Sequence, residues 1–196
     1  MNHETINIEK VERSCPACED YAKEHSTSPP KIAVMACEGA CSKGEIARRA
    51  ANLVAHRMAR DSTVRICLGG AFTKDTGQRE LVRRAGKVIA IEGCFISCSS
   101  RMMKGALKGL DPVIIQADTL YDADLPFGID EVAEEELSEC ARVTAETVVK
   151  EHINTAPSEK KKSNKETVCA RIKNKSVKIR QKLKEGHAKH AQYHVN

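Results

Sequence analysis

Residues 89–102 read IAIEGCFISCSSRM, an apolar run that ends at Gly93 and is followed by Cys94 and Cys98. A short apolar run rich in β-branched residues is typical of a strand that is buried on both faces of a parallel sheet. The residues from Cys98 onward have a helical pattern that ends near Gly109, and glycine favours helix C-termini. The stretch therefore predicts a strand, a tight loop that carries thiols, and a helix.

Other segments of the chain repeat this alternation. The further predicted strands are KIAVMA, TVRICL and PVIIQA, at residues 31–36, 63–68 and 112–117. The predicted helices cover about 42–58, 77–85, 98–108 and 130–152. Ser42 and Glu45 have the spacing of a capping box at the start of the first of these helices. Alternating strands and helices predict an α/β fold with an open, mostly parallel, Rossmann-like sheet of about four strands and flanking helices.

Composition divides the chain into three regions. Residues 1–30 form a polar N-terminal segment that holds the CPAC motif at Cys15 and Cys18 and ends in STSPP. Residues 31–153 carry the strand and helix patterns, and residues 154–196 form a basic linker and tail. The tail from Pro157 onward has a net charge of +9, so the remainder has a net charge of −4. The basic character therefore belongs to an appendage of the α/β domain.

The nine cysteines are interpreted through the expected cellular compartment. No apolar stretch approaches the roughly 20 residues of a membrane helix, and the polar start does not look like a secretory signal. We therefore expect a cytoplasmic protein that does not bind membranes. In a reducing cytosol, clustered cysteines indicate metal or redox chemistry more often than a disulfide framework.

Five of these cysteines are expected at one edge of the sheet. Cys37, Cys67 and Cys94 each end or follow a predicted strand, and open α/β folds bind ligands at the carboxyl ends of their strands. Cys41 and Cys98 lie where helices begin, and a helix N-terminus favours the thiolate form that binds metals. The sequence predicts a shared metal site, with zinc as the first choice. An iron–sulfur cluster is the alternative, because cysteine thiolates serve both.

The middle region resembles the DGC-domain family, which is named for an Asp-Gly-Cys motif and is expected to bind zinc. The resemblance covers about residues 31–150 and depends on ACEGACSKGEIARRAANLVA, ICLGGAF and IAIEGCFISC. It implies a metal held by four cysteines, at the positions Cys37, Cys67, Cys94 and Cys98. This chain has Glu92 where the name-giving Asp stands, and it has an additional thiol at Cys41.

A second hypothesis is a thiol redox or sulfur-transfer enzyme. Here Cys94 would be the nucleophile and Cys98 or Cys41 the resolving thiol, because exchange needs an activated, accessible sulfur. The CPAC pair would then be a mobile relay. As a metal-binding pair it would need further ligands such as Cys41 or His25, and a free dithiol is equally compatible. The sequence alone identifies no catalytic residue, so it does not decide whether the protein is an enzyme.

The remaining cysteines and the tail have simpler interpretations. Cys140 shares a predicted helix face with apolar residues and is expected in the core. The tail holds KKKSNK and three histidines, at His187, His190 and His194. Its lysines would neutralise phosphates, but Tyr193 is its only aromatic residue, so nucleic-acid binding is the weaker interpretation. We favour a solvated tail, or one that binds an unidentified protein partner.

Overall fold

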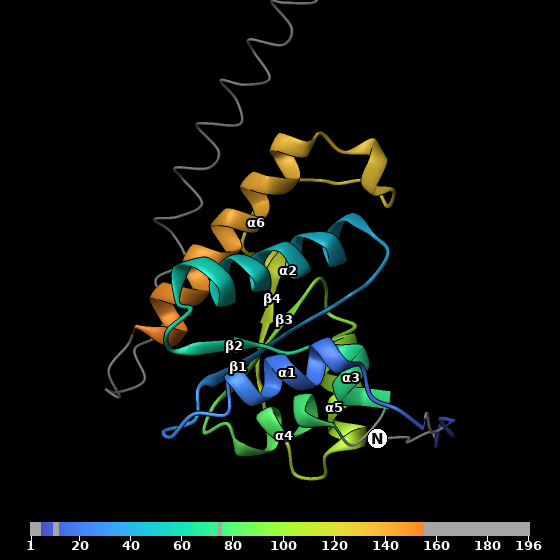
Figure 1. The fold of residues 1–196 in the computed structure, drawn as a ribbon. Helices are drawn as coiled ribbons and strands as arrows, with labels where there is room; N and C mark the ends of the chain where they lie inside the picture. Colours follow the sequence, from blue (N-terminus) through green and yellow to red (C-terminus); the bar gives the residue numbers. More distant parts are fainter. Residues whose placement is uncertain (1–4, 10–11, 74–75, 155–196) are drawn as a thin grey trace, which may run out of the picture. The chain divides into compact units, whose positions relative to one another are not determined.

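The computed structural model of the chain describes residues 5–9, 12–73 and 76–154. Its centre is a four-stranded sheet with the order β2-β1-β3-β4, in which every neighbouring pair is parallel (Figure 1). The strands are β1 (Ile32–Ala36), β2 (Thr63–Arg65), β3 (Val88–Glu92) and β4 (Val113–Gln116). This confirms the predicted α/β class and its mostly parallel sheet.

Six α-helices of the described residues surround this sheet. They are α1 (Pro16–Glu24), α2 (Ser42–Leu53), α3 (Leu68–Thr73), α4 (Gly77–Arg84), α5 (Cys98–Ala106) and α6 (Glu134–Val148). Helices α2 and α6 pack together on one side of the sheet, and α1, α3, α4 and α5 lie on the other (Figure 1). Short π-helical turns at Val54–Met58 and Val149–Ile153 extend α2 and α6.

The central strands are buried because helices cover both faces of the sheet. Every residue of β3 is buried, and residues 33–36 of β1 have no exposed surface. Small residues of α2, including Ala47 and Ala50, are also fully buried, so this helix lies close to the strands. The core is built from aliphatic side chains and methionine, as expected for a sequence with 3% aromatic residues.

The start of α2 differs from the sequence prediction. Cys41 is the N-cap residue and Ser42 is already helical, so the predicted capping box is wrong. The Ser42 hydroxyl donates to the carbonyl oxygen of Pro126 at 2.6 Å. The Glu45 carboxylate accepts hydrogen bonds from Arg48 at 2.7 and 2.8 Å. Both side chains therefore make tertiary or ion-pair contacts in place of the local cap.

The second strand is shorter than the predicted 63–68. The N–H of Ile66 still donates to a β1 carbonyl, but the N–H of Cys67 donates to the side chain of Gln78. Helix α3 then begins at Leu68. Cys67 therefore lies in the turn between β2 and α3, where a side chain accepts its N–H.

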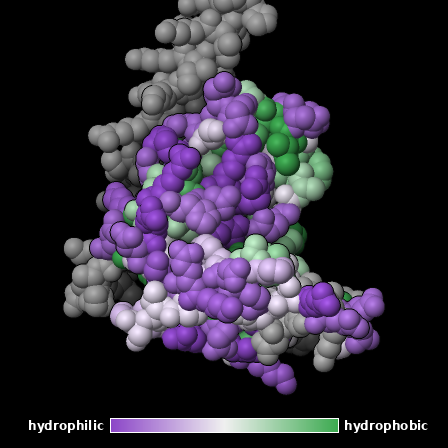
Figure 2. Space-filling view, in the orientation of Figure 1, coloured by the Kyte–Doolittle hydropathy of each residue, from purple (hydrophilic) through white to green (hydrophobic). Residues whose placement is uncertain are grey.

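The molecular surface drawn in Figure 2 is mostly hydrophilic. A green patch at the upper right lies over the segment that leads into α6, where Phe127 is 75% exposed (Figure 2). None of the helices in the described part of the chain is long and apolar enough to cross a bilayer. The histidines and basic residues of the tail lie outside the described residues, so the interpretations of the tail stay predictions.

Candidate cysteine site at the carboxyl edge of the sheet

The strand order places three cysteines after three neighbouring strands. Cys67, Cys37 and Cys94 follow β2, β1 and β3, which lie side by side in that order. Cys41 is the N-cap of α2, and Cys98 is the first residue of α5. These five side chains, called the edge thiols below, all lie on connections that leave the carboxyl ends of the strands.

Glycines allow the connection after β1 to touch the loop after β3. A Cβ atom added to Gly93 would lie 2.7 Å from the carbonyl carbon and oxygen of Lys43. A Cβ atom added to Gly44 would lie 2.6 Å from the carbonyl oxygen of Gly39. Real side chains essentially never approach this closely, so only glycine fits at either position. Gly93 therefore packs the loop after β3 against the first turn of α2, and Gly44 packs that turn against the loop after β1.

Cys37 is the most buried of the edge thiols, with 7% of its surface exposed. Burial raises the pKa of its thiol, and hydrogen bonds from the backbone of Gly39 and Gly93 partly oppose that effect. The Cys37 and Cys41 sulfur atoms lie 3.2 and 3.9 Å from the position that a Cβ of Gly39 would take. Cys37 also interacts electrostatically with Cys98. Cys37 is therefore next to thiols from both loops.

A buried carboxylate fixes the start of α5. Glu92 has no exposed surface, and its carboxylate accepts hydrogen bonds from the Ser99 hydroxyl and the Ser100 N–H, both at 2.7 Å. The Ser99 N–H also donates to it, at 3.3 Å. The preceding residue Ser97 is left-handed, with φ of 54°, so Glu92 satisfies the helix N-terminus from the strand. This contact holds Cys98 at the carboxyl edge.

A single ammonium group interacts with thiols of both loops. Lys43 donates a hydrogen bond of 3.1 Å to Asp118, and this bond is the main reason that the pKa of Lys43 is raised. Cys94 and Cys41 contribute smaller effects in the same direction. Lys43 therefore places one positive charge within electrostatic range of a thiol from each connection.

The edge thiols share one edge of the sheet without forming a compact group. Within residues 5–9, 12–73 and 76–154, no three side chains of His, Cys, Asp or Glu lie close enough together to hold a metal ion. The backbone brings the thiols to one edge of the sheet, and their side chains do not converge on one point.

The pattern of strands and thiols coincides with a known family. The sequence profile described as the DGC domain matches residues 33–142, which is more than half of the chain. The chain belongs to the DGC domain family. The matched region starts in β1, ends in α6 and includes all five edge thiols. No curated protein matches the chain. No solved structure matches it either.

Outside the DGC domain, the CPAC motif lies at the start of α1. Cys15 is the N-cap residue and Pro16 is the first helical residue. The Cys18 thiol is hydrogen-bonded to Cys15 and to Cys67. Sequence reasoning missed this contact and considered His25, whose ring instead stacks on Tyr21 with centroids 4.0 Å apart. Proline at the first helical position was the available signal, since it predicts a helix start at the motif.

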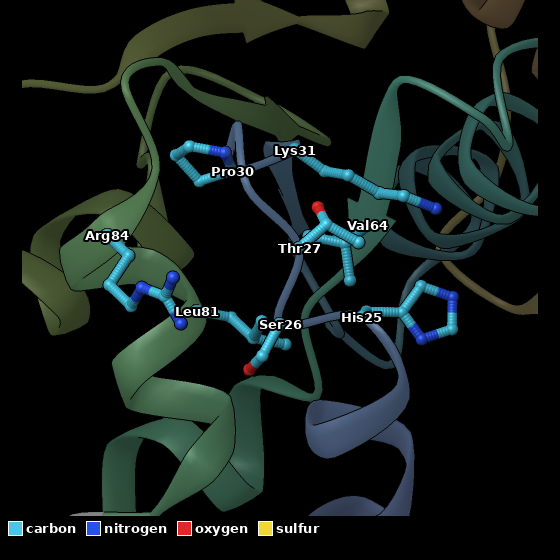
Figure 3. Close-up of a pocket in the computed structure, with 8 residues that line it drawn as sticks. All are labelled: His25, Ser26, Thr27, Pro30, Lys31, Val64, Leu81 and Arg84. Carbon is cyan, nitrogen blue, oxygen red and sulfur yellow. The ribbon is translucent and has the colours of Figure 1, made fainter.

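Two hollows in the surface of the described residues lie away from the edge thiols of the DGC domain. Figure 3 shows a small one between the end of α1, the start of β1, and α4, lined by side chains that include His25, Lys31 and Arg84. Its volume of about 10 Å³ suffices for roughly one water molecule. A larger one of about 600 Å³ lies near the turns before β3 and β4 and includes Lys87 and Lys108. Neither hollow is lined by a cysteine.

Cys140 lies in α6 and is 6% exposed, in agreement with its prediction as a core residue. Burial raises the pKa of its thiol to about 11. A neutral, enclosed thiol of this kind is a poor nucleophile and a poor metal ligand. Cys140 is therefore a matched control for substitutions at the carboxyl edge.

Proposed function

We propose that the DGC domain of this chain binds a thiophilic metal ion, zinc first, through the edge thiols. The ligands would be Cys37, Cys67, Cys94 and Cys98, with Cys41 as a fifth thiol. The supporting observation is the close packing of Gly93 on the first turn of α2, which brings the thiol-bearing connections after β1 and β3 together at one edge of the sheet. Packing alone does not require cysteines at the end of each of three neighbouring strands.

The chemistry of these residues suits a soft metal ion. Thiolates are preferred ligands of zinc, and four of them need nearby positive groups because they leave a net negative charge. Backbone N–H groups of Gly39 and Gly93 donate to the Cys37 sulfur, and the Lys43 ammonium group interacts with Cys41 and Cys94. Because the thiol side chains do not point to one common position in this structure, metal binding would require them to turn toward such a position and lose their protons.

The metal would act mainly on the fold. A closed four-thiolate zinc site contributes directly to folding free energy. It would join three strand connections that otherwise depend on the contacts of Gly93 and Glu92. An iron–sulfur cluster is the competing proposal, because cysteine thiolates hold both groups.

The test is the metal and sulfide content of the full chain purified without air. The proposal expects about one zinc per chain in wild type and in Cys140→Ser, and strongly reduced zinc in Cys37→Ser and Cys94→Ser. Iron with matching acid-labile sulfide would establish the cluster in place of zinc. Less than about a tenth of an equivalent of any metal in wild-type protein would remove both proposals.

A thiol redox or sulfur-transfer enzyme is the second candidate. It is favoured by the Lys43 ammonium group, which interacts electrostatically with both Cys94 and Cys41. Here Cys94 would attack, and Cys98 or Cys41 would resolve the mixed disulfide. In this case Cys94→Ser should abolish disulfide formation and leave the metal content unchanged. Equal loss of metal and fold in that variant would favour the metal site.

A further inference from the structure

A buried amide joins the CPAC motif to the end of β2. Gln78 of α4 is 1% exposed. Its Nε2 donates to the carbonyl oxygen of Cys18 at 3.0 Å, and its Oε1 accepts the N–H of Cys67 at 3.0 Å. One side chain therefore fixes the backbone of both cysteines. This arrangement is specific, because a buried amide must satisfy both its donor and its acceptor.

A second contact fastens the same end of α1 to α4. The Glu19 carboxylate accepts the N–H of Gly77, with distances of 3.2 and 3.3 Å to its two oxygens. One turn later, Ala22 is 2% exposed and belongs to the core. A Cβ atom on Gly77 would lie 2.7 Å from the Cβ of Ala22, so the two helices approach closely. The CPAC motif is thus held in place beside Cys67.

The three thiols of this region form a chain with Cys18 in the middle. Cys18 is hydrogen-bonded to Cys15 on one side and to Cys67 on the other. A Cβ atom on Gly70 would lie 3.5 Å from the Cys67 sulfur and 3.8 Å from the Cys18 sulfur, so this glycine leaves room for both. Cys15 and Cys67 are exposed and Cys18 is partly buried. Reagents therefore reach the two outer thiols more easily than the central one.

The outer thiol at Cys15 is the better nucleophile. The N–H of Cys18, then the Cys18 thiol and the N–H of Ala17, donate to the Cys15 sulfur and lower its pKa. An accessible thiolate beside a partly buried thiol is the division of roles that thiol–disulfide exchange uses.

We propose that Cys15, Cys18 and Cys67, while Cys67 holds no metal ion, form a thiol–disulfide exchange site that takes oxidising equivalents from a small-molecule disulfide. Exchange needs only that the central sulfur contacts both of its neighbours in turn. That is the contact pattern of Cys18.

The reaction balances with the small disulfide as the oxidant. The Cys15 thiolate attacks one sulfur of the small disulfide, forms a mixed disulfide and releases one small thiolate. Cys18 then attacks the Cys15 sulfur, releases the second small thiolate, and gives up its proton to a released thiolate. The result is a Cys15–Cys18 disulfide and two reduced small thiols. The Cys67 thiolate next attacks Cys18, which forms Cys18–Cys67 and frees the Cys15 thiolate without further oxidation.

The experiment treats the reduced full chain with glutathione disulfide, blocks the remaining thiols with an alkylating reagent, and maps tryptic peptides by mass. Cleavage after arginine and lysine places Cys15 and Cys18 together in residues 14–23 and Cys67 in residues 66–74. The proposal expects an internal disulfide in the first peptide at early times and a cross-link between the two peptides later. Oxidation confined to Cys37, Cys41, Cys94 or Cys98 would overturn it.

Single substitutions separate the steps. Cys67→Ser should stop at the internal disulfide, and Cys15→Ser should slow formation of the Cys18–Cys67 link at least about tenfold, because the entry thiolate is lost. Cys18→Ser should leave Cys15 as a mixed disulfide with glutathione, whereas a direct Cys15–Cys67 link in that variant would refute the central role of Cys18. Cys140→Ser is the control and should behave as wild type.

Two further measurements protect the test from unfolding and from metal binding. Gln78→Ala should slow the later cross-link relative to the earlier internal disulfide in the same sample, and that ratio does not depend on the folded fraction. Zinc is measured in the Cys37→Ser/Cys94→Ser variant. If that variant retains zinc, and the zinc is lost when Cys15 is also replaced, the three thiols are a metal site and the exchange proposal is wrong.

Discussion

Gly93 offers the sharpest test of how the carboxyl edge is built. In Gly93→Ala the new Cβ would lie 2.7 Å from the Lys43 carbonyl carbon and oxygen and 2.8 Å from the Gly44 nitrogen. Ordinary van der Waals contact begins at 3.4 Å, so the backbone of one loop must move by more than half an ångström. Overpacking of this kind costs about 1–3 kcal/mol. For a chain of this size that corresponds to a decrease in Tm of roughly 2–12 °C.

The assay is urea unfolding of the reduced protein, followed by far-ultraviolet circular dichroism because the sequence has no Trp. The matched control is Gly105→Ala in α5, where no atom of the described residues lies within 4 Å of the added Cβ. Alanine in a helix is favoured over glycine, so this control should gain about 0.5–1 kcal/mol.

Metal content gives Gly93→Ala a second readout. If the two loops must touch for the edge thiols to share an ion, the variant should lose metal in parallel with its stability. A free energy of unfolding within about 0.5 kcal/mol of wild type would show that the loops separate at little cost. Close packing of the connections after β1 and β3 would then not be what holds the edge thiols together.

Three further outcomes are expected. Hydrogen bonds from Arg48, and then from Arg49, hold the pKa of Glu45 at about 2, below its ordinary 4.5. The Glu45 carboxylate therefore stabilises the fold above pH 4.5, and this stabilisation is lost as the pH falls toward 2. Glu45→Gln should remove roughly 2–3 kcal/mol at neutral pH and flatten the dependence of unfolding free energy on pH in that window; an unchanged slope would contradict the assignment. Glu92→Ala should lower the free energy of unfolding in urea by about 2–4 kcal/mol, because buried N–H groups of α5 lose their acceptor. Glu92→Asp keeps a carboxylate on a shorter side chain and should lose less. Deletion of residues 157–196, with their net charge of +9, should abolish any salt-sensitive retention on an immobilised polyanion, and unchanged retention would exclude the tail as the docking element.

The sheet was predictable because buried parallel strands appear in the sequence as continuous apolar runs. All four predicted runs contain a strand, and Gly93 marked the end of β3 and the start of the loop that follows it. Helices α1 and α3 were not predicted. In α1 only Ala22 is buried, so the segment has little apolar periodicity. In α3 the sequence LGGAFT is six residues long and has two glycines, which disfavour a helix.

The positions of the edge thiols followed from the strand pattern, but their contacts did not. Sequence spacing shows that Cys37 and Cys94 follow strands. Only the three-dimensional structure shows that Gly93 lets the loop after β3 touch the first turn of α2. The link between Cys18 and Cys67 depends on Gln78, a residue of a third segment. Its role is invisible in a linear pattern, because a glutamine in an amphipathic helix is normally a surface residue.

The central place of β1 determines when the carboxyl edge comes into existence during synthesis. This strand is made first, yet its inner neighbour β3 is made more than fifty residues later. A nascent chain that stops before β3 exposes Cys15, Cys18, Cys37, Cys41 and Cys67 without the loop that packs against them. If the edge binds an ion as proposed, its delivery would therefore follow closure of the sheet, because a ribosome-bound fragment ending near Lys87 lacks Cys94 and Cys98.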